Sequence, residues 1–272
     1  MVAVMHAAME PHHAASIQNL IAAFQKNDEI LALLLGGSLA HGFARPDSDI
    51  DVAIVLTPAA FVAQKATGRL HYNNRELCTY PGYIDGKYMD EDFLRAVAAR
   101  GSDPARFAFK DARVLFSRLP GLERILADIV RYPVEQQAGR VERFAAQLLG
   151  WRWYASEAAR QQNAYLDLLA RQKIVLFSVR LVLALNQEFF PYHKWMLRVL
   201  DTVPRQPPGM RAAIDALVRT PGLSGDAIDR YCRDVLAFAG IDHDTANASW
   251  PTFFMRDTEL RWMSEEPAID DL

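Results

Sequence analysis

The sequence predicts an α+β fold in which a mixed sheet with helices is followed by a helical bundle. Two apolar runs, 30–35 and 50–56, have the length of buried strands and are bounded by turn residues. From Val134 onward, apolar and aromatic residues instead recur at intervals of three and four, which is the helical period. We therefore expect two domains, one over 1–132 and one over 133–272.

Local patterns predict the remaining elements. Apolar residues at helical spacing indicate helices, and Asp85-Gly86 is a favoured two-residue turn, which indicates a hairpin whose second arm is a strand. We assign no function to the polar stretch 67–75. The predicted helices of the first half cover 11–27, 39–43, 59–65, 93–100 and 122–131, with a last strand over 111–116, and those of the second half cover 141–159, 165–185, 210–218 and 224–239.

Composition and charge restrict the classes of function. The chain has 272 residues, of which 51% are hydrophobic and 23% are charged, as in soluble globular proteins. Its formal charge of −3 argues against a basic face that binds long nucleic acid. Small molecules therefore rank above nucleic acids as acceptor substrates. Cys78 and Cys232 have no metal-ligand spacing, and we expect reduced thiols. With no signal-peptide pattern and no apolar run long enough to cross a membrane, the expected location is the cytoplasm.

The chemistry-bearing residues lie at the two predicted strands. Gly36-Gly37-Ser38 directly follows the first strand, and the glycines allow backbone amides to approach an anion such as a phosphate, to which Ser38 could donate. Asp49 and Asp51 lie two apart at the start of the second strand, so their carboxylates share a face at a separation of about 6–7 Å. Mg²⁺ takes oxygen ligands and is commonly held by one or two carboxylates together with substrate phosphates. The two motifs therefore predict a site for a magnesium-loaded nucleotide.

The ordered combination of Gly36-Gly37-Ser38 and Ser48-Asp49-Ile50-Asp51 resembles the signature of the nucleotidyltransferase superfamily related to DNA polymerase beta. Within it, the chain is similar to the small enzymes that adenylylate aminoglycoside and lincosamide antibiotics. The resemblance implies an N-terminal polymerase-beta-like nucleotidyltransferase domain. It also implies a Mg²⁺-dependent transfer of a nucleoside monophosphate, most simply AMP from ATP, to a hydroxyl of a small-molecule acceptor, with pyrophosphate released. The helical domain is then expected to form the other wall of the cleft.

The resemblance further implies a third carboxylate from a neighbouring strand. We assign this role to Asp90, because Asp90 and Asp92 would share one face of the strand that follows the predicted hairpin turn. Asp92 is the first alternative, and Asp85 is more readily a turn residue. Asp90 would bind metal with Asp49 and Asp51, or would draw the proton from the acceptor hydroxyl.

One further nucleotide-binding residue and two other functions follow from the same resemblance. Lys194, in the sequence Pro191-Tyr192-His193-Lys194-Trp195, is expected to meet the nucleotide phosphates. The chain could instead be a regulatory or antitoxin-like member that acts on or binds a protein, although such members are typically short. It could also be a member that binds nucleotide without catalysis, which the intact Asp49 and Asp51 disfavour.

Overall fold

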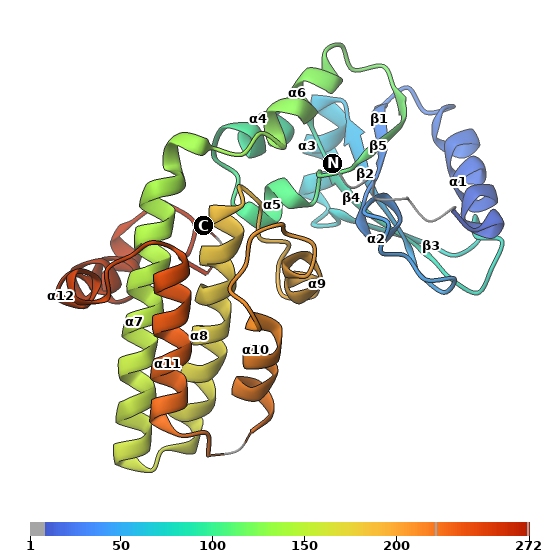
Figure 1. Ribbon diagram of the computed structural model, residues 1–272. Coiled ribbons are helices and arrows are strands. Elements are labelled where there is room, and N and C mark those ends of the chain that lie inside the picture. Colours follow the sequence, from blue (N-terminus) through green and yellow to red (C-terminus); the bar gives the residue numbers. More distant parts are fainter. Residues whose placement is uncertain (1–8, 221, 271) are drawn as a thin grey trace. The chain divides into compact units, whose positions relative to one another are not determined.

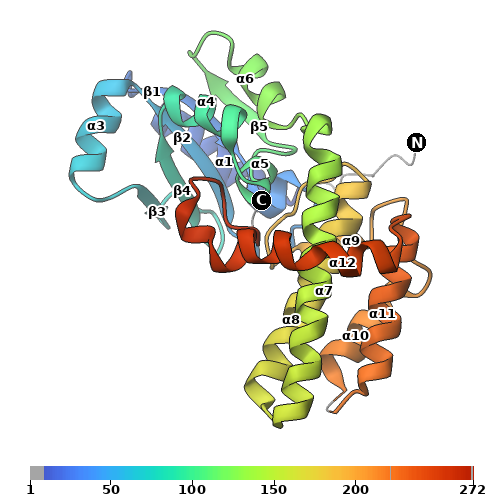
Figure 2. The same cartoon turned by 90° about the vertical axis from the view of Figure 1, so that its left-hand side faces the viewer.

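Residues 9–220, 222–270 and 272 are described by a computed structural model, in which the chain divides into two units (Figures 1 and 2). The first unit comprises Met1–Gly101 and Ala105–Arg131, and the second comprises Ser102–Pro104 and Tyr132–Leu272. The first unit contains the sheet, whereas the second is helical, as the α+β prediction requires. Among the described residues, no helix combines the length and the apolar character needed to cross a membrane.

The first unit is built on a five-stranded mixed sheet in the order β3-β4-β2-β1-β5. β2 and β4 are parallel, and the other neighbours are antiparallel. A parallel pair needs a long crossover, and here α3 and β3 lie between the two strands in the sequence. The strands are β1 (Ile30–Leu35), β2 (Ile50–Leu56), β3 (His71–Asn74), β4 (Ile84–Met89) and β5 (Arg113–Ser117).

Helices cover both faces of this sheet (Figure 1). Because side chains alternate along a strand, β2 directs Ile54 to one face and Val55 to the other. Ile54 belongs to an apolar cluster with Leu20 of α1, and Val55 belongs to a second cluster with Leu94 of α4. The helices of this unit are α1 (Pro11–Phe24), α2 (Gly37–Ala40), α3 (Pro58–Ala66), α4 (Glu91–Arg100), α5 (Asp103–Phe107, which begins in the second unit) and α6 (Leu122–Ile129).

The first two predicted strands are confirmed with the bounds given above, but the predicted hairpin turn is wrong. Asp85 and Gly86 both lie inside β4, and β3 occupies part of the polar stretch 67–75, to which no function was assigned. A Cβ atom at Gly86 would lie 3.0 Å from Val52 Cγ2 and 3.1 Å from Ile54 Cδ1. The glycine is therefore explained by close packing against β2 and not by a turn.

The second unit is organised around the long helices α7 and α8, which lie side by side (Figures 1 and 2). α12 packs across α7, where Gly150 leaves room for Phe254: a Cβ atom at Gly150 would lie 2.2 Å from the ring. The helices are α7 (Gln137–Gln161), α8 (Ala164–Leu185), α9 (Met196–Leu200), α10 (Met210–Arg219), α11 (Gly225–Phe238) and α12 (His243–Phe254), with short turns at η1 (Val134–Gln136), η2 (Met255–Glu259) and η3 (Arg261–Met263).

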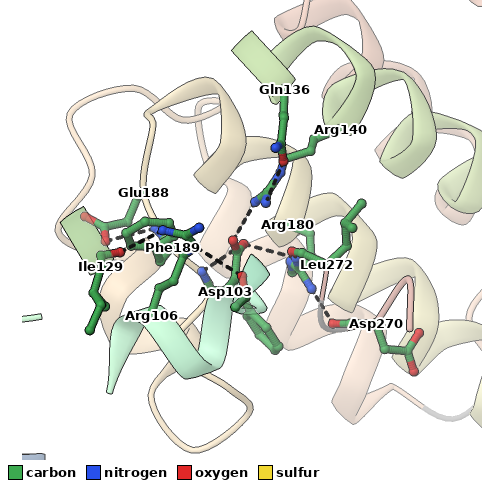
Figure 3. Close-up of polar contacts among 12 residues, drawn as sticks. Asp103, Arg106, Ile129, Gln136, Arg140, Arg180, Glu188, Phe189, Asp270 and Leu272 are labelled. Atoms are coloured by element: carbon green, nitrogen blue, oxygen red, sulfur yellow. Dashed lines mark hydrogen bonds and ion pairs between the residues drawn. The ribbon is translucent and has the colours of Figure 1, made fainter. Parts of the chain in front are cut away.

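A buried charged cluster joins several segments of the second unit (Figure 3). The Asp103 carboxylate, 3% exposed, accepts hydrogen bonds from Arg140 Nη1 at 2.5 Å and Arg180 Nη2 at 3.1 Å. The backbone N–H of Phe190 adds a third bond, at 3.3 Å. The Arg180 guanidinium also lies 4.6 Å from the centre of the Phe144 ring and 4.5 Å from that of Phe190. Asp103 thus compensates the charge of two arginines that have little access to water.

We expect Asp103→Ala to destabilise the second unit by about 3–5 kcal/mol, because it leaves two buried guanidinium groups without their carboxylate. Urea unfolding followed by circular dichroism measures this change. Asp234→Ala is the matched control, since Asp234 is an exposed acid on α11, and its effect should stay within about 0.5 kcal/mol. Equal free energies of unfolding for the two variants would contradict the role given to Asp103.

Candidate active site

The turn after β1 is built around the side chain of Asp51. The Gly36 N–H donates to the Asp51 carbonyl oxygen at 2.9 Å, which extends the pairing of β1 with β2. Gly37 then takes a φ of +59°, and a Cβ atom there would lie 1.8 Å from Asp51 Oδ2. A residue with a side chain is disfavoured by both the backbone conformation and the contact. Gly37, one of the two glycines predicted to bind phosphate, thus also makes room for the Asp51 carboxylate.

Ser38 has a buried hydroxyl with unused hydrogen-bonding capacity. The residue is 6% exposed, and within the described part of the chain its Oγ has no hydrogen-bond partner. A buried hydroxyl without a partner costs free energy, so such a group in a native protein calls for an explanation. A phosphate oxygen bound at the turn would accept this hydrogen bond, in agreement with the role predicted for Ser38.

The three carboxylates next to this turn are Asp49, Asp51 and Asp85. Asp51 and Asp85 are directly paired in the register of β2 and β4, so their side chains leave the sheet on the same face. Asp49 precedes Asp51 by two residues. The pKa of Tyr83 is raised, first by hydrogen bonding of its hydroxyl toward Asp49 and then by the Asp49 charge, and the charges of Asp85 and Asp51 act in the same direction. All three carboxylates are therefore near enough to influence one hydroxyl group.

Asp90 and Asp92 lie beyond the end of β4, at the start of α4. Asp90 is the N-cap of α4, where its Oδ1 accepts from Phe93 N at 2.8 Å. It follows β4 and lies five residues beyond Asp85, a distance of about 16 Å along an extended chain. Asp92 lies in the first turn of α4 and is exposed. The prediction that Asp90 lies on a strand beside the aspartate pair is wrong, and Asp85, the alternative kept open, is the acid in register with Asp51.

The sequence analysis missed the polar residues that surround Asp85 on β3 and β4. Asn73 is paired with Asp85, and His71 is paired with Lys87, so all four side chains share one face of the sheet. His71 Nε2 donates a hydrogen bond to Asp85 Oδ1. The available signal was the alternation of polar residues at 71, 73, 85 and 87, but it becomes visible only when the two segments are recognised as paired strands.

The backbone just before Asp49 is held in place from two sides. The Ser48 carbonyl oxygen accepts from the Tyr80 hydroxyl at 2.6 Å and from His13 Nε2 at 3.0 Å. Burial lowers the pKa of His13, which favours a neutral imidazole whose Nε2 carries the proton. Asp47 instead forms an exposed ion pair with Arg45 at 2.9 Å, as expected of a turn residue. The backbone directly before Asp49 is therefore fixed, whereas the Asp47 side chain faces solvent.

The donor set suits a hard divalent cation. In the described parts of the chain, there is no cluster of three or more His, Cys, Asp or Glu side chains that could hold a metal ion. Mg²⁺ does not require one, because it keeps several waters and takes part of its shell from substrate phosphates. Carboxylate oxygens, with the cradle at Gly37 and the unsatisfied Ser38 hydroxyl beside them, fit such a metal–phosphate group.

Lys194 lies in an exposed turn of the second unit, before α9. Its ammonium group is 4.8 Å from the centre of the Trp195 ring, which is a cation–π contact. Its role toward the nucleotide stays a prediction from the resemblance.

We expect Gly37→Ala to impair both the fold and the site. Forcing alanine to a positive φ costs about 1–2 kcal/mol, and the new methyl group must displace the Asp51 carboxylate. Gly36→Ala is the matched control, because a Cβ atom there would come no closer than 3.6 Å to another group. Thermal unfolding and titration with MgATP would measure the two effects. Equal behaviour of the two variants would contradict this account of the turn.

Comparison with known proteins agrees with this geometry. Residues 18–79, which include the glycine turn and the aspartate pair, match the family described as polymerase beta, nucleotidyltransferase. The structure is similar to the crystal structure of a nucleotidyltransferase-like protein from Exiguobacterium sibiricum, with a TM-score of 0.47 and 11% identity, covering 90% of this chain and 80% of that chain. No curated protein matches the chain. Residues 18–79 are thus similar to the nucleotidyltransferase domain of the polymerase beta family.

Proposed function

We propose that the protein transfers a nucleoside monophosphate, most simply AMP from ATP, to a hydroxyl group of a small-molecule acceptor in a Mg²⁺-dependent reaction that releases pyrophosphate. Nucleotidyl transfer in general follows from the family. The observation that supports the mechanism best is the register of β2 and β4, in which Asp85 is the direct partner of Asp51. Paired carboxylates beside a glycine turn are suited to a metal-bound triphosphate.

In this proposal the residues of the first unit have two tasks. Gly36 and Gly37 present backbone to the β- and γ-phosphates, and the Ser38 hydroxyl donates to a phosphate oxygen. The carboxylates of Asp49, Asp51 and Asp85 hold the divalent cation. When bound, Mg²⁺ would neutralise the charge on the entering and leaving oxygens while the acceptor hydroxyl attacks the α-phosphorus in line.

The acceptor is assigned by class. A chain with a net charge of −3 lacks the cationic excess typical of proteins that bind long nucleic acid, which favours a small acceptor. Radiolabelled ATP incubated with aminoglycosides, lincosamides and candidate proteins tests this assignment. Label on a small molecule supports the proposal, whereas label found only on a protein supports the regulatory alternative.

We expect Asp49→Asn combined with Asp51→Asn to abolish binding of MgATP and to lower transfer by at least about 1,000-fold, because the metal supplies several kcal/mol of charge stabilisation. Isothermal titration calorimetry measures the binding. Asp47→Asn is the matched control, because Asp47 belongs to the same loop but is 75% exposed and paired with Arg45. MgATP affinity unchanged from the natural sequence in the double variant would contradict the proposed metal site.

A second pair of variants tests the choice of the third carboxylate. Asp85→Asn keeps the shape of the side chain but removes a charge from the face that holds Asp51, so we expect transfer to be lost. Asp90→Asn should keep both the fold and the activity, because asparagine is as good an N-cap as aspartate. Initial rates of pyrophosphate release measure both. The reverse result, with Asp90→Asn inactive and Asp85→Asn active, would reinstate the assignment made from the sequence.

A further inference from the structure

We propose that His71 is a positioning residue of the metal site: its Nε2–H group holds Asp85 in the orientation in which the carboxylate meets a divalent cation. The inference rests on the proposed function, in which Asp85 is the third carboxylate. His71 lies on the edge strand β3, within residues 18–79 that match the family but outside the glycine turn and the aspartate pair.

The contact follows from the register of β3 and β4. Asn73 is paired with Asp85, and His71 is paired with Lys87, so His71 and Asp85 are diagonal neighbours on one face of the sheet. Diagonal neighbours on antiparallel strands lie about 7–8 Å apart, within reach of a long or aromatic side chain. The imidazole spans this distance, and Nε2 contacts Asp85 Oδ1. The two side chains are 62% and 30% exposed, so a bound nucleotide or metal can approach the pair.

The chemistry of the two groups determines the direction of the hydrogen bond. A carboxylate only accepts, so His71 Nε2 must carry the proton. The bond uses Oδ1 of Asp85 and leaves Oδ2 available to a cation.

Such partners have a measurable effect on metal sites. Removing a group that hydrogen-bonds to a metal-ligating side chain typically costs 10- to 100-fold in metal affinity or activity. An exposed ion pair, by contrast, contributes only about 0–1 kcal/mol to the free energy of unfolding. A positioning role and a purely structural role therefore predict different results when His71 is replaced.

Mn²⁺ is a suitable probe, because carboxylate sites that suit Mg²⁺ also accept it and its free ion is detected by electron paramagnetic resonance. For His71→Ala we expect Mn²⁺ affinity to fall by about 10- to 100-fold, with a nearly unchanged thermal unfolding midpoint. His71→Gln should recover most of the affinity, because the glutamine amide can donate from a similar position. Asn73→Ala, on the same strand and face, is the matched control and should bind Mn²⁺ as the natural protein does.

The same titrations in an Asp85→Asn background test whether His71 acts through Asp85. We expect His71→Ala to have no additional effect there. Full Mn²⁺ affinity in His71→Ala, or an equal loss in both backgrounds, would overturn the positioning role while leaving the proposed function standing. If the natural protein shows no Mn²⁺ binding that depends on Asp51, the proposed function itself fails, so the two failures are distinguished.

Discussion

The parallel pairing of β2 with β4 is the constraint on which the candidate site depends. It alone puts Asp85 beside Asp51, because the two residues are far apart in the sequence and belong to strands joined through α3 and β3. A slip of one residue would turn every side chain of β4 to the opposite face. Gly86 helps to exclude that slip, since a Cβ atom at this position would already lie 3.0 Å from Val52 Cγ2. The apolar packing of Gly86 on one face of the sheet thus helps to fix the register, and the register places Asp85 beside Asp51 on the other face.

Hydrogen bonds to backbone carbonyl groups hold the rest of the site in place. The Gly36 N–H bonds to the carbonyl of Asp51, and the Ser48 carbonyl accepts from Tyr80 and His13. These bonds fix the backbone on both sides of Asp49. A glycine at position 37 is then needed because the Asp51 carboxylate occupies the space of a side chain.

The second unit contains a buried cluster of charged side chains around Asp103. Asp103 lies outside the bundle helices in the sequence, and yet it accepts bonds from Arg140 on α7 and Arg180 on α8. The Arg180 guanidinium also lies close to the rings of Phe144 and Phe190. A guanidinium at this depth is stable only with partners, and the short stretch Ser102–Pro104, which contains Asp103, belongs to the same unit as the helices.

The sequence by itself determined the local features, which are strands 30–35 and 50–56 and the glycine turn with Ser38 between them. These depend on residues close together in the chain, where hydrophobic pattern and glycine placement are sufficient. Only the tertiary structure distinguishes the positions of Asp85 and Asp90. Asp85-Gly86 has the local pattern of a turn, but its conformation is set by neighbouring strands, and Asp90, with a helix after it, becomes a cap. His71 was found for the same reason, because strand register is a non-local property that no short stretch of sequence contains.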